Sequence, residues 1–151
     1  MPNYKQLKTM KRKILLFALI SVLTLANLNV MAQDKTQPDN SDKLVILWTS
    51  DNPYVAERVA FMYTHNAKKQ QWFEEVTLIV WGPSAKLIVE NKKLQDKVKA
   101  MQADGVELQA CIVCASSYNI VDELKEIGFE VKGMGKPLSD YLKSDAKVLT
   151  F

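Results

Sequence analysis

Two apolar stretches, Leu-Val-Ile-Leu-Trp at 44–48 and Val-Thr-Leu-Ile-Val-Trp at 76–81, decide the fold of this chain. Each is an almost unbroken apolar run, which is typical of a β-strand that is covered on both faces. The first run is followed by Thr-Ser-Asp-Asn-Pro at 49–53, and the second by Gly-Pro at 82–83. Such residues cap helices or form turns, so we expect each strand to lead into a helix.

Helical periodicity follows both runs. Residues 54–69 are predicted to form a helix whose apolar residues recur at helical spacing, namely Val55, Val59, Met62 and Tyr63. Ser84 is expected to cap a second, long helix that ends at Ala103-Asp104-Gly105. The inward positions of that helix are expected to be Leu87, Ile88, Leu94, Val98 and Met101.

Three further strands are predicted at 106–113, 129–132 and 147–151. Short helices separate them: one opens at Asn119, with Asp122 three positions on, and closes at Gly128, and the other spans 138–142. Strands that alternate with helices predict a parallel sheet with right-handed crossovers and helices on both faces. The expected fold is a three-layer α/β/α sandwich with a mostly parallel five-stranded sheet, of the Rossmann or flavodoxin type.

The first 32 residues have the three-part pattern of a secretory signal peptide. A positive cluster at 11–13 precedes an uncharged stretch at 14–28, and Val30-Met31-Ala32 precedes a cleavage site before Gln33. The apolar stretch is shorter than the ~20 residues that span a bilayer. We therefore expect export across the inner membrane to the periplasm, with no stable membrane anchor after cleavage.

Cleavage changes the charge of the protein. All 17 acidic residues lie at Asp34 or later, whereas five of the 20 basic residues lie in the first 13 positions, and either Met1 or Met10 can be the start. The 119-residue product therefore has a net charge of −2 instead of +3. This charge argues against a nucleic-acid partner. Residues 33–42 are polar and are expected to form a flexible linker before a single domain at 43–151.

The carboxyl ends of parallel strands are where such sheets bind ligands. This rule selects the loops at 49–53, 82–84 and 111–119. The polar candidates at this edge are Asp51, Asn52, Tyr118 and Asn119, although Asp51 is also suited to cap the following helix. A small-molecule or metal-ion carrier that uses the crevice between the first and third loops is one hypothesis, and it rests on topology alone.

No cofactor or resident metal is expected. Two cysteines and one histidine are too few for a structural zinc site, and 82–84 lacks the glycine pattern of a phosphate loop. The histidine, His65, has no evident acid or nucleophile partner and is expected to be exposed or to cap a helix. The three tryptophans are expected in the core or at a subunit interface: Trp48, Trp72 and Trp81.

Cys111 and Cys114 form a C-x-x-C motif at the end of the third predicted strand, just before a helix. A thiolate there would lie near amide N–H groups, which lower a thiol pKa. Cys111 is the candidate nucleophile, and Cys114 is its resolving partner or the other half of a resting disulfide. The two can bridge only if the chain turns directly after Cys111, since residues three apart on a strand lie ~10 Å apart. A structural disulfide and inert burial remain alternatives.

The stretch from Gly105 to Cys114, Gly-Val-Glu-Leu-Gln-Ala-Cys-Ile-Val-Cys, followed by Gly128-Phe-Glu-Val and Gly133-Met-Gly135, resembles the DsrE/DsrF-like family. The resemblance extends over nearly all of 43–151. It implies a compact domain with a five-stranded parallel sheet that assembles as a dimer, trimer or hexamer. It also implies sulfur relay as a cysteine persulfide.

The resemblance assigns roles to the two cysteines. Cys111 falls at the position of the sulfur-carrying cysteine, and Cys114 matches a second cysteine found in one branch of the family. Relay members often carry Arg-Gly where this chain has Tyr118-Asn119, although Asn can adopt the left-handed backbone that Gly would supply.

Two functional hypotheses follow. The first is an exported sulfur carrier or thiol-active protein, with at most a sulfurtransferase-like or thiol-exchange activity and a thiol or sulfur-donor protein as partner. The second is a non-catalytic oligomeric binding or assembly module whose cysteines are structural. Both hypotheses include a homo-oligomer.

Overall fold

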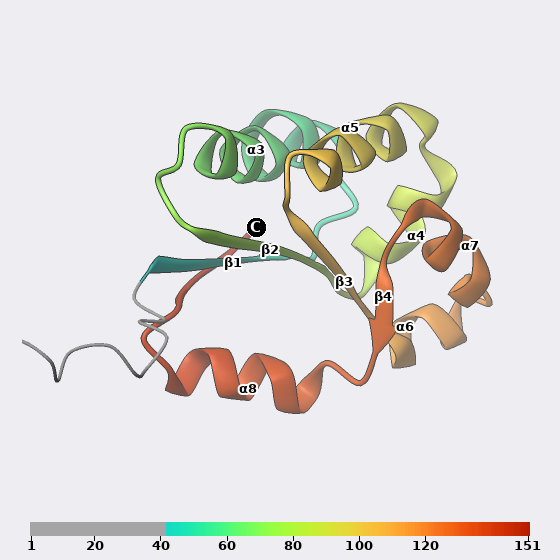
Figure 1. Cartoon of the computed structure of the whole chain (residues 1–151). Coiled ribbons are helices and arrows are strands. Elements are labelled where there is room, and N and C mark those ends of the chain that lie inside the picture. The colour runs from blue at the N-terminus through green and yellow to red at the C-terminus, as the bar shows by residue number, and fades with distance from the viewer. Residues whose placement is uncertain (1–41) are drawn as a thin grey trace, which may run out of the picture. The chain divides into compact units, whose positions relative to one another are not determined.

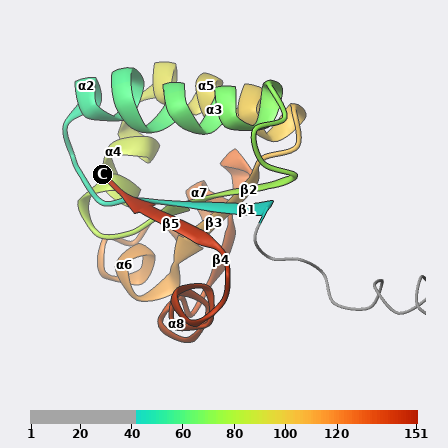
Figure 2. The same cartoon turned by 90° about the vertical axis from the view of Figure 1, so that its left-hand side faces the viewer.

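The computed structural model describes residues 42–151, which form a five-stranded, all-parallel sheet in the order β4-β3-β2-β1-β5. The strands are β1 (Lys43–Trp48), β2 (Glu75–Val80), β3 (Glu107–Cys111), β4 (Glu130–Lys132) and β5 (Lys147–Thr150). The two apolar runs pair with each other, from Lys43 beside Glu75 to Trp48 beside Val80. Helices lie on both faces of the sheet, which confirms the predicted three-layer fold (Figures 1 and 2).

The predicted signal peptide and the first nine residues of the predicted linker, 33–41, lie outside the described residues. Within 42–151, no helix has both the length and the apolar composition needed to cross a membrane.

The two faces of the sheet are covered unequally. In Figures 1 and 2, α3 and α5 lie on one face, and α8 lies on the other. The first face carries the larger core, to which most helices contribute buried side chains. Those helices are the π-helix η2 (Ala56–Ala60), α3 (Phe61–Lys69), α4 (Pro83–Glu90), α5 (Lys92–Ala103), α6 (Ile112–Ser117) and α7 (Val121–Ile127). The short α2 (Pro53–Val55) has no buried residue, and α8 spans Gly135–Lys143.

The helical stretch after β1 turns a different face to the sheet than the apolar spacing predicts. Val59 and Met62 are 40% and 55% exposed, whereas the buried positions are Ala56, Ala60, Phe61, Thr64 and Ala67. The indole of Trp48 is fully buried and meets the Phe61 ring edge-on at 4.8 Å. Alanine side chains let the helix approach this bulky layer, so the expectation for Val59 and Met62 was wrong.

The predicted long helix after β2 is two helices, α4 and α5, divided at Asn91. Asn91 has an extended backbone, and its side chain accepts a hydrogen bond from the Leu94 N–H at 3.2 Å, which caps α5. Of the predicted inward positions, Ile88, Leu94, Val98 and Met101 are buried, and Leu87 is partly buried against the same core. Ser84 does not cap α4: Gly82 is the N-cap residue, and the Ser84 hydroxyl is buried.

The segment after β3 also differs from the prediction. The strand ends at Cys111 rather than at residue 113, and α7 begins at Val121 rather than at Asn119. Asn119 instead adopts the left-handed backbone that its side chain tolerates, with φ of 57°. Gly128, with φ of 118°, closes α7 as expected.

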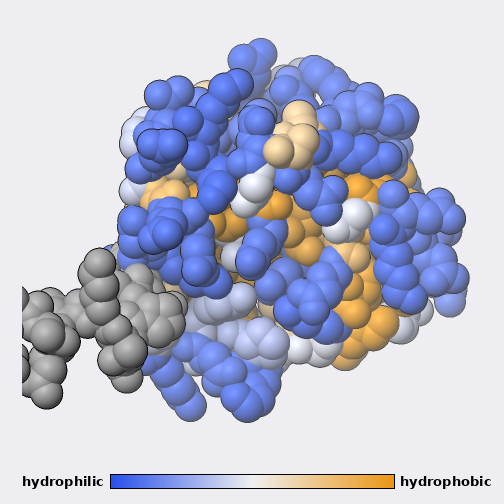
Figure 3. Space-filling model, viewed as in Figure 1, coloured by the Kyte–Doolittle hydropathy of each residue, from blue (hydrophilic) through white to orange (hydrophobic). Residues whose placement is uncertain are grey.

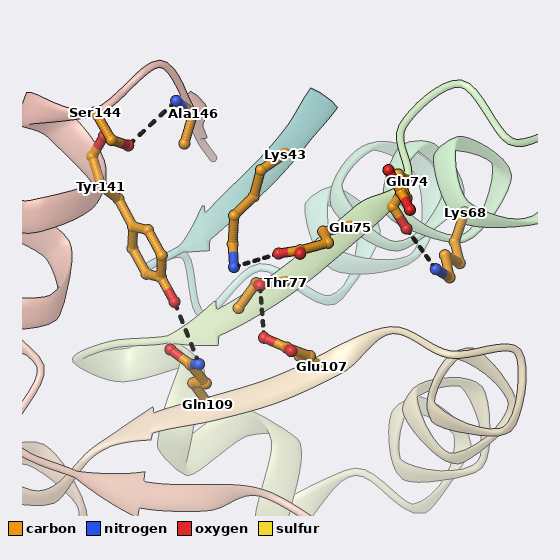
Figure 4. A network of polar contacts seen from close by, with 10 residues as sticks. All are labelled: Lys43, Lys68, Glu74, Glu75, Thr77, Glu107, Gln109, Tyr141, Ser144 and Ala146. Atoms are coloured by element: carbon orange, nitrogen blue, oxygen red, sulfur yellow. Dashed lines mark hydrogen bonds and ion pairs between the residues drawn. The ribbon is translucent and has the colours of Figure 1, made fainter. Parts of the chain in front are cut away.

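The face covered by α8 is divided between polar and apolar residues. Near the amino ends of the strands, Lys43 bonds Glu75 (2.7 Å), Thr77 bonds Glu107 (3.1 Å) and Gln109 lies 3.4 Å from the Tyr141 hydroxyl (Figure 4). Nearer the carboxyl ends, a small apolar cluster consists of Val45, Ile79, Cys111 and Met134. Figure 3 shows apolar surface between polar side chains on the side of the molecule that faces the viewer in Figure 1.

Candidate functional site

Cys111 is the last residue of β3, and its side chain faces α8. Side chains alternate along a strand, so Cys111 shares this face with Gln109, which lies beside Tyr141 of α8. The Cys111 side chain packs with Val45, Ile79 and Met134 and is only 3% exposed. The apolar cluster under α8 therefore encloses this sulfur.

The chain turns into α6 directly after Cys111. Cys111 is the N-cap residue of α6, with φ of −74° and ψ of 116°, and Ile112 is the first helical residue. Cys114 is then the third residue of the helix, a position whose side chain lies close to the N-cap side chain. Both cysteines are free thiols, and Cys114 packs against the small cluster that contains Cys111. The structure thus supplies the turn that a bridge between these two positions requires.

Cys114 is half-buried and has a backbone hydrogen-bond donor. The N–H of Gly82, in the connection between β2 and α4, donates to Cys114 Sγ at 3.2 Å. Gly82 has φ of 71° and ψ of −135°, a conformation that side-chain-bearing residues rarely adopt. This glycine backbone aims an N–H group at the sulfur.

Ser84 holds the connection between β2 and α4 in place. Its buried hydroxyl donates to the Trp48 carbonyl at 2.6 Å and accepts from the Trp81 N–H at 3.0 Å. These bonds link the carboxyl ends of β1 and β2 to the start of α4. The position of the Gly82 donor is therefore determined by the sheet rather than by a free loop.

The pKa of the Cys114 thiol is raised above its ordinary value. The largest cause is burial, which disfavours the thiolate. The hydrogen bond from Gly82 lowers the pKa, and the neighbouring Cys111 raises it further. The sequence-based expectation of a lowered thiol pKa is wrong for Cys114, because loss of hydration outweighs the one N–H donor.

The four polar residues predicted at the ligand edge do not gather in one place. Asp51 and Asn52 follow β1, and β2 separates that strand from β3, which puts about 10 Å between the two strands. Asn52 caps α2 by accepting the Tyr54 N–H at 2.9 Å, so the capping residue is Asn52 and not Asp51. Tyr118 and Asn119 are closer to the cysteines, and the Tyr118 N–H donates to the Cys114 carbonyl at 3.2 Å.

His65, the only histidine of the chain, is not part of the site around the two cysteines. His65 Nε2 lies 2.6 Å from Asp104 Oδ2, between α3 and the end of α5. No group of three or more metal-ligating side chains occurs within 42–151. The crevice predicted between the first and third loops is interrupted, because the Gly82 connection lies between them in the sheet order.

The sequence alone did not reveal the role of Gly82. The loop at 82–84 was selected because it follows a strand. The direction of a backbone N–H group, however, cannot be predicted from the sequence, in which only the glycine itself is visible. Likewise, the exposure of the two thiols depends on what α8 and α6 cover, which the C-x-x-C spacing does not specify. Both features became apparent only from the packing.

Comparisons with known proteins agree with this geometry. The model of the DsrE/DsrF-like family matches residues 42–151. A conserved protein of unknown function from Bacteroides thetaiotaomicron, BT1422, has a similar structure, with 32% identity, a TM-score of 0.74 and coverage of 77% of this chain and 100% of its own. The ychN protein from E. coli shares the fold at 18% identity and a TM-score of 0.56, covering 72% of this chain and 98% of its own. A search of curated proteins finds no match.

Proposed function

Because the chain belongs to the DsrE/DsrF-like family, we propose that it is an exported sulfur carrier or thiol-exchange protein whose working groups are Cys111 and Cys114. The observation that carries this proposal is the meeting of two free thiols across the first turn of α6, with the Gly82 N–H bonded to one sulfur. Two thiols at this spacing can hold a persulfide on one and release it by attack from the other. The partner is a thiol protein or sulfur-donor protein, and the carrier acts as a homo-oligomer in the periplasm.

The sulfur-carrier function is tested by mass spectrometry of the protein after incubation with inorganic polysulfide. The wild-type protein should gain 32 Da on a peptide that contains residues 111–114, or lose two hydrogens when the pair closes to a disulfide (standard atomic masses). The Cys111→Ser/Cys114→Ser double variant is the matched control and should gain nothing. A wild-type protein whose thiols remain unmodified and unreactive from pH 5 to 9 would contradict the function.

The exported location has a separate test. Expression of the full chain in a Gram-negative host should yield a periplasmic protein whose N-terminus is Gln33, because signal peptidase cuts after small residues such as Ala32. A product that stays in the cytoplasm with residues 1–32 attached would contradict export. Replacing Lys11, Arg12 and Lys13 by Glu is the control, since it removes the positive cluster and should block processing.

A second function, an oligomeric assembly module, is favoured by one observation. Apolar side chains are exposed along the helical stretch after β1, namely Tyr54 (76%), Val59 (40%) and Met62 (55%), and Trp72 (54%) follows that stretch. Exposed apolar surface of this kind often marks a protein–protein contact. Val59→Lys with Met62→Lys should dissociate an oligomer built on this face, as measured by light scattering after gel filtration. Val113→Lys is the control, because Val113 is even more exposed (72%) but lies on α6.

A further inference from the structure

We propose that incoming sulfur is bound first by Cys114 and that Cys111 is the resolving thiol, the reverse of the order that the family resemblance implies. This inference rests on the proposed function and assigns the two roles within it. The surroundings of the two sulfur atoms differ in solvent access, in hydrogen bonding and in position relative to α6.

Access favours Cys114. Exchange begins when a thiolate attacks a sulfur atom of the donor, so the donor must reach the attacking sulfur. Cys111 is 3% exposed and is enclosed with Met134, itself 1% exposed. Cys114 is half-buried, and its helix exposes Val113 (72%) next to it. A protein-bound or bulky donor can meet Cys114 without displacing the core, whereas contact with Cys111 requires the cluster under α8 to open.

Hydrogen bonding also favours Cys114. The Gly82 N–H lies 3.2 Å from Cys114 Sγ, and no such backbone donor to Cys111 Sγ occurs among the described residues. The negative charge that this sulfur carries as a thiolate before it attacks meets a hydrogen-bond donor that is already in position. The buried Ser84 hydroxyl, bonded to the ends of both β1 and β2, keeps this connection in position.

The position of Cys111 suits the second step. As the N-cap residue it lies one helical turn from Cys114, and at 3% exposure its side chain offers almost no surface to an external donor. This burial keeps external sulfur donors from the resolving thiol until a sulfur has been loaded on Cys114. Burial is thus an advantage for Cys111 only in the resolving role.

The steps balance as follows. The Cys114 thiolate attacks the outer sulfur of a persulfide donor R–S–SH, forming Cys114–S–SH and releasing the thiolate R–S⁻. The Cys111 thiolate then attacks Cys114 Sγ, forming the Cys111–Cys114 disulfide and releasing HS⁻. The sulfane sulfur gains two electrons, which the two cysteine thiols lose. An external dithiol then reduces the disulfide and returns both cysteines to the thiol form.

The order of the two thiols is tested with the aromatic disulfide 5,5′-dithiobis(2-nitrobenzoate), whose released thiolate is coloured. The Cys111→Ser variant should keep the fast phase and retain one stable mixed disulfide on Cys114. The Cys114→Ser variant should react slower by about tenfold or more, because a buried thiol reacts only through local opening of the fold. Wild type should release two equivalents and retain no label, as Cys111 displaces the second thiolate.

A further variant separates access from misfolding. Met134→Ala in the Cys114→Ser background removes the cover over Cys111 and should restore a fast reaction, whereas Met134→Ala in the Cys111→Ser background should leave the rate at Cys114 unchanged. A fast phase that survives in Cys114→Ser and disappears in Cys111→Ser would overturn the proposed order, even if wild type forms a persulfide. Wild type that forms neither a persulfide nor the Cys111–Cys114 disulfide with polysulfide would refute the sulfur-carrier function, whichever thiol reacts first with the aromatic disulfide.

Discussion

The two faces of the sheet differ in how they are covered and in what they carry. One face supports a core with buried residues from six helical segments, whereas the other is covered by α8 over a small cluster that includes Cys111. The core on the first face is mainly apolar, while the second face carries a network of polar side chains near the amino ends of the strands (Figure 4). The comparison indicates that one face holds the larger core and that the other, with the carboxyl edge beside it, carries the two cysteine thiols.

The largest expected effect is the loss of unfolding free energy when a buried isoleucine on either face of the sheet is replaced by alanine. Ile46 and Ile79 are both fully buried, but Ile46 faces the larger core and Ile79 faces α8. Ile46→Ala should lower the free energy of unfolding by about 4 kcal/mol, and Ile79→Ala by about 2.5 kcal/mol, because a single helix can settle into a cavity more easily than a layer of several. Urea unfolding measures both. Equal losses would show that the two faces are equally rigid.

A smaller effect is expected at Gly82. Alanine would meet no atom within 4 Å there, but φ of 71° strains any side-chain-bearing residue, so Gly82→Ala should cost about 1–2 kcal/mol of unfolding free energy. Any relaxation of the backbone also moves the N–H away from Cys114 and should slow the reaction of that thiol. Gly133→Ala is the matched control, since Gly133 has equal space and no left-handed backbone. Full reactivity of Cys114 in a destabilised Gly82→Ala protein would argue against a role for this N–H.

The smallest effect concerns pH. Because burial raises the pKa of Cys114, alkylation of the Cys111→Ser variant by iodoacetamide should reach half its maximal rate above pH ~8.5, the usual thiol value. The raised pKa of Cys114 also makes the free energy of unfolding depend on pH. A thiol whose pKa is higher in the folded state than in the unfolded chain favours folding below the unfolded pKa, and that contribution is lost as pH rises through the folded pKa. A half-maximal rate at pH 7 would mean that the Gly82 N–H outweighs burial.

Much of the fold could be predicted from local patterns. The runs at 44–48 and 76–81 became β1 and β2, and Gly128 ended its helix with a left-handed backbone. The errors occurred where tertiary contacts outweighed spacing. Val59 and Met62 have the spacing of a core face, but the bulk of Trp48 and Phe61 requires alanines at the contact. Asn91 interrupts an otherwise helical pattern because its side chain caps the next helix.

The candidate site shows the same division. The C-x-x-C motif and its place at the end of a strand were evident from the sequence, as was the need for a turn after Cys111. The sequence did not indicate which sulfur is enclosed. The alternation of side chains along a strand predicts that Cys111 and Gln109 lie on the same face of the sheet. Only the packing of α8 on that face buries the Cys111 side chain.

The sequence by itself therefore determined the alternation of strands and helices, the membership in a family and the identity of the two thiols, because these depend on residues that are neighbours along the chain. The tertiary structure alone decided the inward face of the helix after β1, the burial of Cys111 and the bond between Gly82 and Cys114. Those features join residues 32 positions apart, or cover one element with another, and they arise only when parallel strands align their carboxyl ends. Side-chain volume and backbone direction at that edge are properties of the packed protein.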